Sequence, residues 1–242
     1  MYTDIHNHIL PCVDDGATSM EDALGMAMKA VAADISTLLA TPHRRWGSRK
    51  EAEPKWVAGQ VLALQTELDS AGIPLRVEPG LEIPVGPTVA ADLHAGIIST
   101  LGNRGYYALL EPSFDQLGPN FLEYIKQVRE LGIGVVLAHP ERAPGIQADI
   151  KILERLAKID VVFQLTSGSI LGHFGENALT ATKIILERAD DWTLVIASDS
   201  HNQGARSPEH LRAAIEAMGA LVGETAANAM VTKNPQKLLS PV

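Results

Sequence analysis

The sequence of 242 residues has almost no cysteine and no long apolar run. Its single cysteine, Cys12, cannot form a disulfide within the chain, so we expect a reducing compartment, the cytoplasm. The longest apolar runs, such as Val135–Ala138 and Val161–Phe163, are far shorter than the ~20 residues of a membrane span. A secretory peptide is not expected either, because Asp4 and His6 interrupt the N-terminal apolar residues. We therefore predict no insertion into a membrane.

Positive charge is also scarce. The chain has 20 Lys and Arg against 29 Asp and Glu, which gives a formal net charge of -9. Binding to a phosphate backbone needs a basic surface, so this balance argues against a nucleic-acid partner. Apolar residues make up 46% of the chain and charged residues 20%, which suits a globular protein with a sizeable core. Because no Ser/Gly/Pro-rich linker divides the sequence, we expect one domain over residues 1–242.

The first sixteen residues contain several groups that can bind a metal ion. Apolar residues such as Ile5 predict a strand, in which side chains two positions apart point the same way, so His6 and His8 share a face. The run Asp14-Asp15-Gly16 then forms a turn that offers two carboxylates close to these rings. Two imidazoles on one face are half of a metal site, and the rest of the chain should supply the other half.

Cys12 lies between these groups and is a candidate nucleophile. Cysteine phosphatases need an arginine six residues after the cysteine to hold phosphate, and that position is Thr18. The adjacent Asp14 and Asp15 would also disfavour a thiolate. We therefore interpret Cys12 as a small packed residue.

Short apolar, β-rich segments alternate with helical patterns along the chain. The predicted strands are the one around His6 and then Ile35–Ala40, Leu75–Glu78, Tyr106–Leu110, Ile133–Ala138, Val161–Leu165 and Thr193–Ala197. The predicted helices are Ser19–Ala33, Pro54 to Gly72, Pro87–His94, Pro119–Leu131, Ala148–Lys158, Asn177–Arg188 and Pro208–Leu239, the last with breaks near Gly219 and Gly223. Seven strands that alternate with helices indicate a parallel α/β sheet or barrel.

Metal-ligating residue types recur at or just after the ends of these strands. They are His6, His8, His43, Glu82, Glu111, His139, Asp199 and His201. In a (β/α) barrel the carboxyl ends of all strands share one rim, which carries the chemistry, so residues remote in sequence would meet there. The sixth strand is an exception, because Gln164 and Thr166 are poor ligands. We leave His94, His173 and His210 as surface or loop residues, since none follows a strand.

The whole set of motifs resembles the polymerase-and-histidinol-phosphatase (PHP) superfamily. The residues that carry this likeness are His6-Asn-His8, Asp14-Asp-Gly16, Thr41-Pro-His43, Gly80-Leu-Glu82, Glu111, His139-Pro-Glu-Arg142 and Asp199-Ser-His201. More narrowly, Asp4-Ile-His-Asn-His-Ile-Leu-Pro, Val13-Asp-Asp-Gly-Ala, Ser198-Asp-Ser-His-Asn202 and Asn234-Pro-Gln-Lys-Leu are similar to the bacterial protein-tyrosine phosphatases encoded with capsule and exopolysaccharide genes. The likeness runs from Asp4 to about Leu239. Cys12 stands where a Gly is expected, and Thr166 where an Asn is usual.

The resemblance implies a distorted seven-stranded (β/α) TIM-like barrel that holds three divalent ions. It implies His6, His8, Glu82 and Asp199 as ligands of the first ion, Glu82, Glu111 and His139 of the second, and Asp15, His43 and His201 of the third. Asp14 remains the alternative to Asp15. Manganese is our first expectation, with iron or zinc as alternatives, because mixed imidazole and carboxylate ligands do not choose among these metals.

Two arginines are the candidate catalytic residues that bind phosphate. Arg142 follows His139 by three residues and Arg206 follows His201 by five, so both could lie over the rim. The resemblance gives both this role, and the alternative for each is a surface arginine paired with a glutamate. The basic segment Arg44–Lys50 could guide an acidic or phosphotyrosine-bearing tail to the rim, or be a solvated loop.

The resemblance therefore implies a metal-dependent protein-tyrosine phosphatase whose partner is a phosphotyrosine-bearing protein, namely the tail of a polysaccharide-assembly tyrosine kinase. The first alternative is a small-molecule phosphatase of the same superfamily, such as one that acts on histidinol phosphate. The second is a metal-bound module that binds the kinase without turnover. A nuclease is disfavoured by the negative charge. Self-association is left open, since nothing in the sequence defines an interface.

Overall fold

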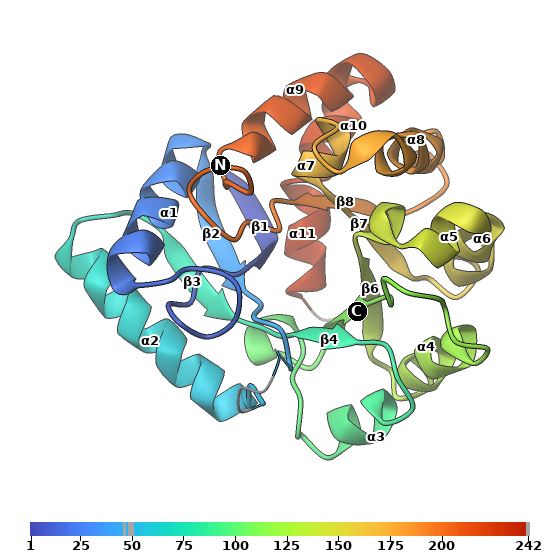
Figure 1. Cartoon of the computed structure of the whole chain (residues 1–242), viewed down its shortest axis with the longest axis horizontal. Helices are drawn as coiled ribbons and strands as arrows, with labels where there is room; N and C mark the ends of the chain where they lie inside the picture. Colours follow the sequence, from blue (N-terminus) through green and yellow to red (C-terminus); the bar gives the residue numbers. More distant parts are fainter. Residues whose placement is uncertain (46, 48–50, 241–242) are drawn as a thin grey trace.

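The computed structural model describes residues 1–45, 47 and 51–240, and in it the strands are parallel and the helices lie outside them (Figure 1). One sheet has the order β1-β2-β3 and the other the order β4-β5-β6-β7-β8. The strands are β1 (Tyr2–Asn7), β2 (Ile35–Ala40), β3 (Arg76–Pro79), β4 (Glu82–Pro84), β5 (Tyr107–Glu111), β6 (Gly134–Ala138), β7 (Val162–Thr166) and β8 (Leu194–Ala197). Each neighbouring pair is parallel, as the alternating sequence pattern predicts.

Single bridges join the two sheets into a distorted barrel. Asn7, at the end of β1, bridges to Ser200, which follows β8, and His43, which follows β2, bridges to Glu82 in β4. The predicted α/β barrel is thereby confirmed. The difference lies at β4, a three-residue strand absent from the prediction, which pairs with β5 and meets the segment after β2 instead of β3. This places Glu82 inside the ring of strand ends.

The helices cover the outer face of the strands. They are α1 (Met20–Ala32), α2 (Pro54–Ser70), α3 (Val89–His94), α4 (Phe121–Glu130), α5 (Pro144–Ala148), α6 (Lys151–Ala157), α7 (Ser167–Ile170), α8 (Gly175–Leu186), α9 (His210–Val222), α10 (Glu224–Ala229) and α11 (Lys233–Leu238), with 3₁₀ turns at Leu101–Asn103 and Pro140–Arg142. The helix predicted from Ala148 to Lys158 is shorter in the structure, because α6 covers only Lys151–Ala157 and Ala148 is the last residue of the separate α5. In the part of the chain that the structure describes, no helix has the length and apolar character to span a membrane.

Two sequence-based details are wrong. The break predicted near Gly219 does not exist, because that residue lies inside α9, while Gly223 with a φ of 84° does end the helix. Cys12 is exposed and not packed, and its thiol donates to the carbonyl oxygen of Thr18. Its φ of 62° explains why glycine is expected there, since few side chains tolerate this region.

Strand side chains alternate between two apolar clusters. On β6, for example, Val135 and Leu137 pack in the large cluster between strands and helices, whereas Val136 and Ala138 belong to a smaller one. The smaller cluster also takes Ile5, Leu39, Leu109 and Val195 from other strands, together with Leu238 at the end of α11. This buried packing fixes the strands, and the polar side chains lie at their carboxyl ends.

Candidate metal centre

The structure brings together all nine residues that the sequence analysis proposed as metal ligands. They form four overlapping groups within which the potential ligand atoms lie within 4.8 Å of one another: His8, Asp15, His43 and His201; His6, His8 and Asp199; His6, Glu82 and His139; His43, Glu82 and Glu111. Six of the nine side chains are buried, and only those of Asp15, His43 and Glu111 reach the surface. Residues that are far apart in the sequence thus meet in a single cluster.

Ligand-type atoms near His6 are spaced as around a common cation. His6 Nε2 lies 3.2 Å from His8 Nε2, 3.3 Å from Glu82 Oε1 and 3.4 Å from Asp199 Oδ1. His8 Nε2 lies 3.4 Å from Glu82 Oε2 and 3.5 Å from Asp199 Oδ1. Ligands about 2.1 Å from one ion are separated by roughly 3 to 3.4 Å, depending on geometry. The donor set therefore fits a metal ion without a large rearrangement.

Hydrogen bonds on the far side of each ring orient the imidazoles. Gln164 Oε1 lies 2.8 Å from His6 Nδ1 and Asp14 Oδ2 lies 2.7 Å from His8 Nδ1, so both Nδ1 atoms donate and both Nε2 atoms keep a lone pair. His201 Nδ1 similarly donates to the carbonyl oxygen of Asp199, at 3.0 Å. Buried His201 Nε2 faces Asp15 Oδ1 and, with the proton on Nδ1, keeps a lone pair that a metal ion can take.

The two aspartates of the turn differ in position. Asp14 is buried and accepts from His8 Nδ1, from the amide of His43 at 2.9 Å and from that of Gly16 at 3.0 Å. Burial alone would raise its pKa, but His8 and these donors hold it at about 2. Asp15 points the other way, with Oδ1 3.3 Å from His201 Nε2 and 3.5 Å from His43 Nε2. The geometry therefore favours Asp15 as a ligand and Asp14 as the residue that orients His8.

Carboxylates crowd the site and shift each other's protonation. Burial and the charge of Glu82 raise the pKa of Glu111 to about 7. Burial also acts against the charged form of Glu82, but the imidazoles of His6, His139 and His43 keep its pKa well below the usual range. The pKa of His139 falls to about 4, because burial and the cation of Arg142 disfavour a second positive charge. Metal binding requires neutral imidazoles and ionised carboxylates, so it would release protons from Glu111 and from His6, His8 and His43, whose pKa values the nearby carboxylates raise against the effect of burial.

The backbone at two of these positions is strained. His139, directly after β6, has a φ of 31°, and Asp199, shortly after β8, has a φ of 48°. Side chains other than glycine seldom adopt such angles, which cost of order 1 kcal/mol or more and cluster at functional sites. The amide of Asp199 donates to the carbonyl oxygen of His6 at 2.9 Å, and this bond between neighbouring strand ends holds the conformation.

Both candidate arginines lie in the same cavity. Its volume is about 360 Å³, and it is lined by Asp15, His43, Arg45, Glu82, Glu111, Phe114, His139, Arg142, Asp199, His201 and Arg206. Arg142 Nη1 and Arg206 Nη2 each donate to Asp199 Oδ2. Buried Arg206 Nε has no hydrogen-bond partner within the described residues. Cationic donors therefore stand beside the metal-type donor set, in the arrangement that a phosphate dianion needs.

Two phenylalanines were not singled out from the sequence. The ring of Phe114 stacks on that of His139, with centroids 5.4 Å apart, and the guanidinium of Arg142 lies 5.1 Å from Phe114 and 4.2 Å from Phe174. Phe114 follows β5 by three residues and is 43% exposed, which is unusual for a large apolar side chain. Its position just after a strand end was the only sequence signal.

The sequence analysis also missed buried positioning groups. Gln164, set aside as a poor ligand, orients His6. Glu141 is fully buried and accepts from the amide of Thr166 at 3.0 Å and from Ser169 Oγ at 2.6 Å, which ties the segment after β6 to the start of α7. His94, His173 and His210 lie outside the cluster, as expected. Of the basic segment 44–50, residues 46 and 48–50 lie outside the described residues.

The fold and the cluster define the class of protein. It is a parallel (β/α) barrel with imidazole and carboxylate donors gathered at the carboxyl ends of its strands. The family follows from comparison with known proteins. Residues 2–240 match the model of the family described as "Capsular polysaccharide synthesis, CpsB/CapC". The chain belongs to this family.

Relatives of known name agree with this assignment. Tyrosine-protein phosphatase YwqE of Bacillus subtilis (strain 168) is 38% identical over 205 residues, which are 84% of this chain and 79% of the relative. Tyrosine-protein phosphatase CpsB of Streptococcus pneumoniae is 29% identical over 241 residues, which are 98% and 97% of the two chains.

Solved structures show the same fold. A chain from the crystal structures of YwqE from Bacillus subtilis and CpsB from Streptococcus pneumoniae, described as unique metal-dependent tyrosine phosphatases, superposes with a TM-score of 0.91 at 31% identity. The superposition covers 99% of this chain and 95% of the solved chain. The lactonase Lmo2620 from Listeria monocytogenes, with a TM-score of 0.61 and 11% identity over 99% of this chain and 94% of its own, shares the fold alone.

Proposed function

We propose that this chain is a metal-dependent protein-tyrosine phosphatase. The main observation behind the proposal is that a cluster of imidazoles and carboxylates suited to metal binding lies beside Arg142 and Arg206 at one cavity. Membership of the CpsB/CapC family and the similarity to proteins named tyrosine-protein phosphatases support the same reaction. The physiological substrate we propose is a phosphotyrosine-bearing protein, specifically the tail of a tyrosine kinase of polysaccharide assembly, in the cytoplasm.

We propose that the clustered residues form three sets of metal ligands. They are His6, His8, Glu82 and Asp199 for the first ion, Glu82, Glu111 and His139 for the second, and Asp15, His43 and His201 for the third. The spacing of the donor atoms and the orientation of the rings by Gln164 and Asp14 support these sets. Three divalent cations against four carboxylates leave a charge of about +2, which suits a phosphate dianion. Manganese is proposed first, with iron or zinc as alternatives.

Divalent ions, when bound, would act as Lewis acids on the phosphoryl group and activate water for its attack. The chain's own residues orient the substrate. Arg206 Nε is a donor without a partner among the described residues, and the guanidinium of Arg142 lies against two aromatic rings, which limit its motion. Both groups can therefore bind phosphate oxygens. The exposed part of Phe114 gives the tyrosyl ring an apolar surface beside them.

The leaving group of a phosphotyrosine is a phenolate, which suits a polar and open cavity. A phenol has a pKa near 10, well below that of an alcohol, so a phenolate departs with less help from a general acid. We therefore assign no proton donor to the leaving oxygen. Aryl phosphates are expected to react faster than alkyl phosphates.

The test compares hydrolysis of a phosphotyrosine peptide and of histidinol phosphate by manganese-loaded protein, before and after chelation. We expect turnover of the peptide, loss of activity with chelator, and slow turnover of histidinol phosphate. Arg142→Ala and Arg206→Ala should each lower kcat/KM about 10- to 100-fold, the range for hydrogen bonds to a charged group. Faster turnover of histidinol phosphate would favour a small-molecule phosphatase, and tight peptide binding without any turnover would favour a binding module.

A further inference from the structure

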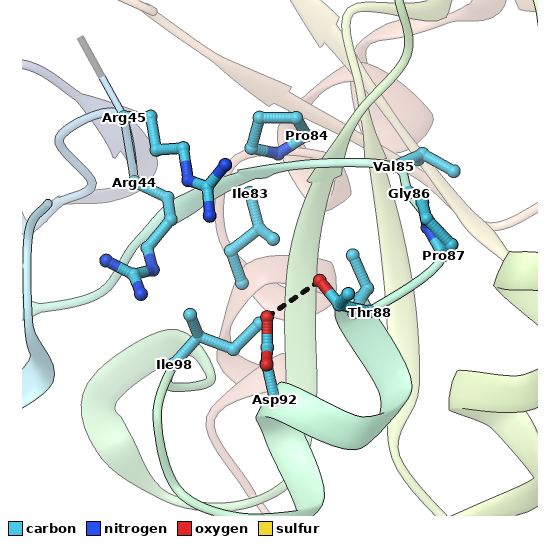
Figure 2. A pocket seen from close by; sticks show the side chains of 11 residues that line it. Arg44, Arg45, Ile83, Pro84, Val85, Gly86, Pro87, Thr88, Asp92 and Ile98 are labelled. Atoms are coloured by element: carbon cyan, nitrogen blue, oxygen red, sulfur yellow. Dashed lines mark hydrogen bonds between the residues drawn. The ribbon is translucent and has the colours of Figure 1, made fainter. Parts of the chain in front are cut away.

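A second pocket lies directly beside the metal cavity, between β4, the start of α3 and the residues after His43 (Figure 2). Its volume is about 330 Å³, and none of its lining residues is a proposed ligand. It is lined by Arg44, Arg45, Ile83, Pro84, Val85, Gly86, Pro87, Thr88, Val89, Asp92 and Ile98. The mechanism proposed above uses no part of it.

The pocket and the metal cavity share a wall. Arg45 lines both spaces, and its side chain is 70% exposed. On β4, Glu82 lines the metal cavity, while the next residue, Ile83, lines the pocket, because successive strand side chains point to opposite faces. A peptide that places a phosphotyrosine in the metal cavity can therefore reach this pocket over Arg45 within a few residues, at roughly 3.3 Å per residue.

The walls of the pocket are mostly apolar. Ile83, Val89 and Ile98 are 2%, 4% and 4% exposed and form its base, and Pro84 and Pro87 are exposed at its edge. In Figure 2, Arg45 and Asp92 lie on opposite sides of the space. An apolar side chain that enters this pocket is removed from water and needs no hydrogen-bond partner there, whereas a polar side chain would lose its hydrogen bonds to water.

The charged groups of the lining already have partners. Asp92 Oδ2 accepts from Thr88 Oγ1 at 2.9 Å. Arg44 donates to the carbonyl oxygen of Ala52 at 3.3 Å and pairs with Glu51, and Arg45 Nε lies 2.6 Å from the same carboxylate. Together with Glu51 and Asp92, the two arginines give no net charge, so the lining does not call for an ion as the occupant.

We propose that this pocket is a substrate subsite that binds an apolar side chain of the phosphoprotein, within a few residues of the phosphotyrosine. The inference rests on the proposed phosphatase function and deepens it, because it names a sequence feature of the substrate. The metal cavity binds the phosphoryl group and the aromatic ring, and the second pocket binds the side chain of a neighbouring residue. Small aryl phosphates do not reach it.

The test uses phosphotyrosine peptides in which one leucine is moved through the three positions on each side of the phosphotyrosine, in a Gly/Ser background. With manganese-loaded protein, leucine at one position should raise kcat/KM about 10-fold over glycine, as partial burial of a leucine side chain predicts. Phenylalanine at that position should act likewise. A peptide with aspartate there should show no such gain, and a preference for aspartate would mean that Arg45 reads charge and would overturn the apolar subsite.

The variant Thr88→Trp fills the pocket from its exposed edge without touching the metal cavity. It should abolish the preference for leucine and leave kcat/KM for para-nitrophenyl phosphate unchanged, which also shows that the variant is folded. Thr180→Trp, the same change at an exposed position beside a different pocket, is the matched control and should keep the preference.

The outcomes separate the two proposals. Turnover of para-nitrophenyl phosphate with no leucine preference at any position, or with a preference that survives in Thr88→Trp, would overturn the subsite alone. Absence of turnover of every aryl phosphate by manganese-loaded protein would overturn the proposed function and this inference with it.

Discussion

Exchange of each aspartate in the turn after β1 for asparagine tests how the metal centre is built. The three hydrogen bonds to Asp14 come from His8 Nδ1, the amide of His43 and that of Gly16, and all three partners are donors. Asp14→Asn keeps the shape but turns one acceptor into an NH₂ group. That group then faces one or two N–H donors, whichever way the amide is turned.

The expected result follows from the charge beside His8. The amide oxygen should face His8 Nδ1 and the amide of His43, because the opposite orientation sets the NH₂ group against two N–H donors instead of one. His8 then keeps its proton on Nδ1 but loses the carboxylate that makes Nε2 a stronger ligand. Loss of a group that orients a ligand typically costs 10- to 100-fold in metal affinity, or about 1.4 to 2.8 kcal/mol. We expect this weakening for Asp14→Asn, with the number of ions at saturating manganese unchanged.

Asp15→Asn should behave differently, because this carboxylate faces His201 and His43 directly. Loss of a ligand and its charge should lower the number of bound ions by one, from three to two. The assay is metal content after dialysis against manganese, combined with titration against a competing chelator. Asp190→Asn, at an exposed position, is the control. An ion lost from Asp14→Asn and retained in Asp15→Asn would reverse the two roles, and unchanged affinity in Asp14→Asn would refute the orienting role.

Two further predictions concern side chains that border the centre. Phe114→Leu should reduce the preference for phosphotyrosine over phosphoserine about 2- to 10-fold, the range for an aromatic contact of 0.5 to 1.5 kcal/mol; an unchanged ratio of the two kcat/KM values would contradict contact with the tyrosyl ring. Burial raises the pKa of Glu141 from 4.5 to about 7, so its contribution to stability is fully present below pH 4.5 and lost as pH rises through 7. Glu141→Gln keeps an acceptor for Thr166 and Ser169 but does not titrate. Its free energy of unfolding should therefore rise by about 2 kcal/mol relative to that of the native chain as the pH increases from 5 to 8, measured by urea unfolding in the presence of chelator. Exposed Glu67→Gln is its control, and a parallel pH dependence of Glu141→Gln and the native chain would show that Glu141 does not titrate in this range.

The sequence alone determined where the ligand-type residues fall. Strand and helix patterns are local, and they placed His139 after β6 and Asp199 after β8 without any structure. Parallel strands put all their carboxyl ends at one rim, so the meeting of these residues followed from topology. The short β4 escaped prediction because three residues are too few for a periodic signal, and its pairing with β5 and His43 is long-range.

Other features depended on tertiary structure. The sequence left Asp14 and Asp15 as alternatives, since neighbouring residues in a turn point in directions set by the backbone. Here Gly16 packs so closely on His8 that a Cβ would overlap its carbonyl oxygen, and the amide of Ala17 donates to that same oxygen. These contacts turn Asp14 inward to His8 and Asp15 outward to the cavity.

The role of Gln164, the meeting of two arginines at one oxygen of Asp199 and the pocket beside β4 were likewise decided by the fold. Each depends on distances between segments that are far apart along the chain, and local propensity carries no information about such distances. The sequence by itself thus determined the kinds of ligand and the end of the barrel where they gather. Only the tertiary structure decided which atom faces which, because packing and hydrogen bonds between strands fix the direction of every side chain.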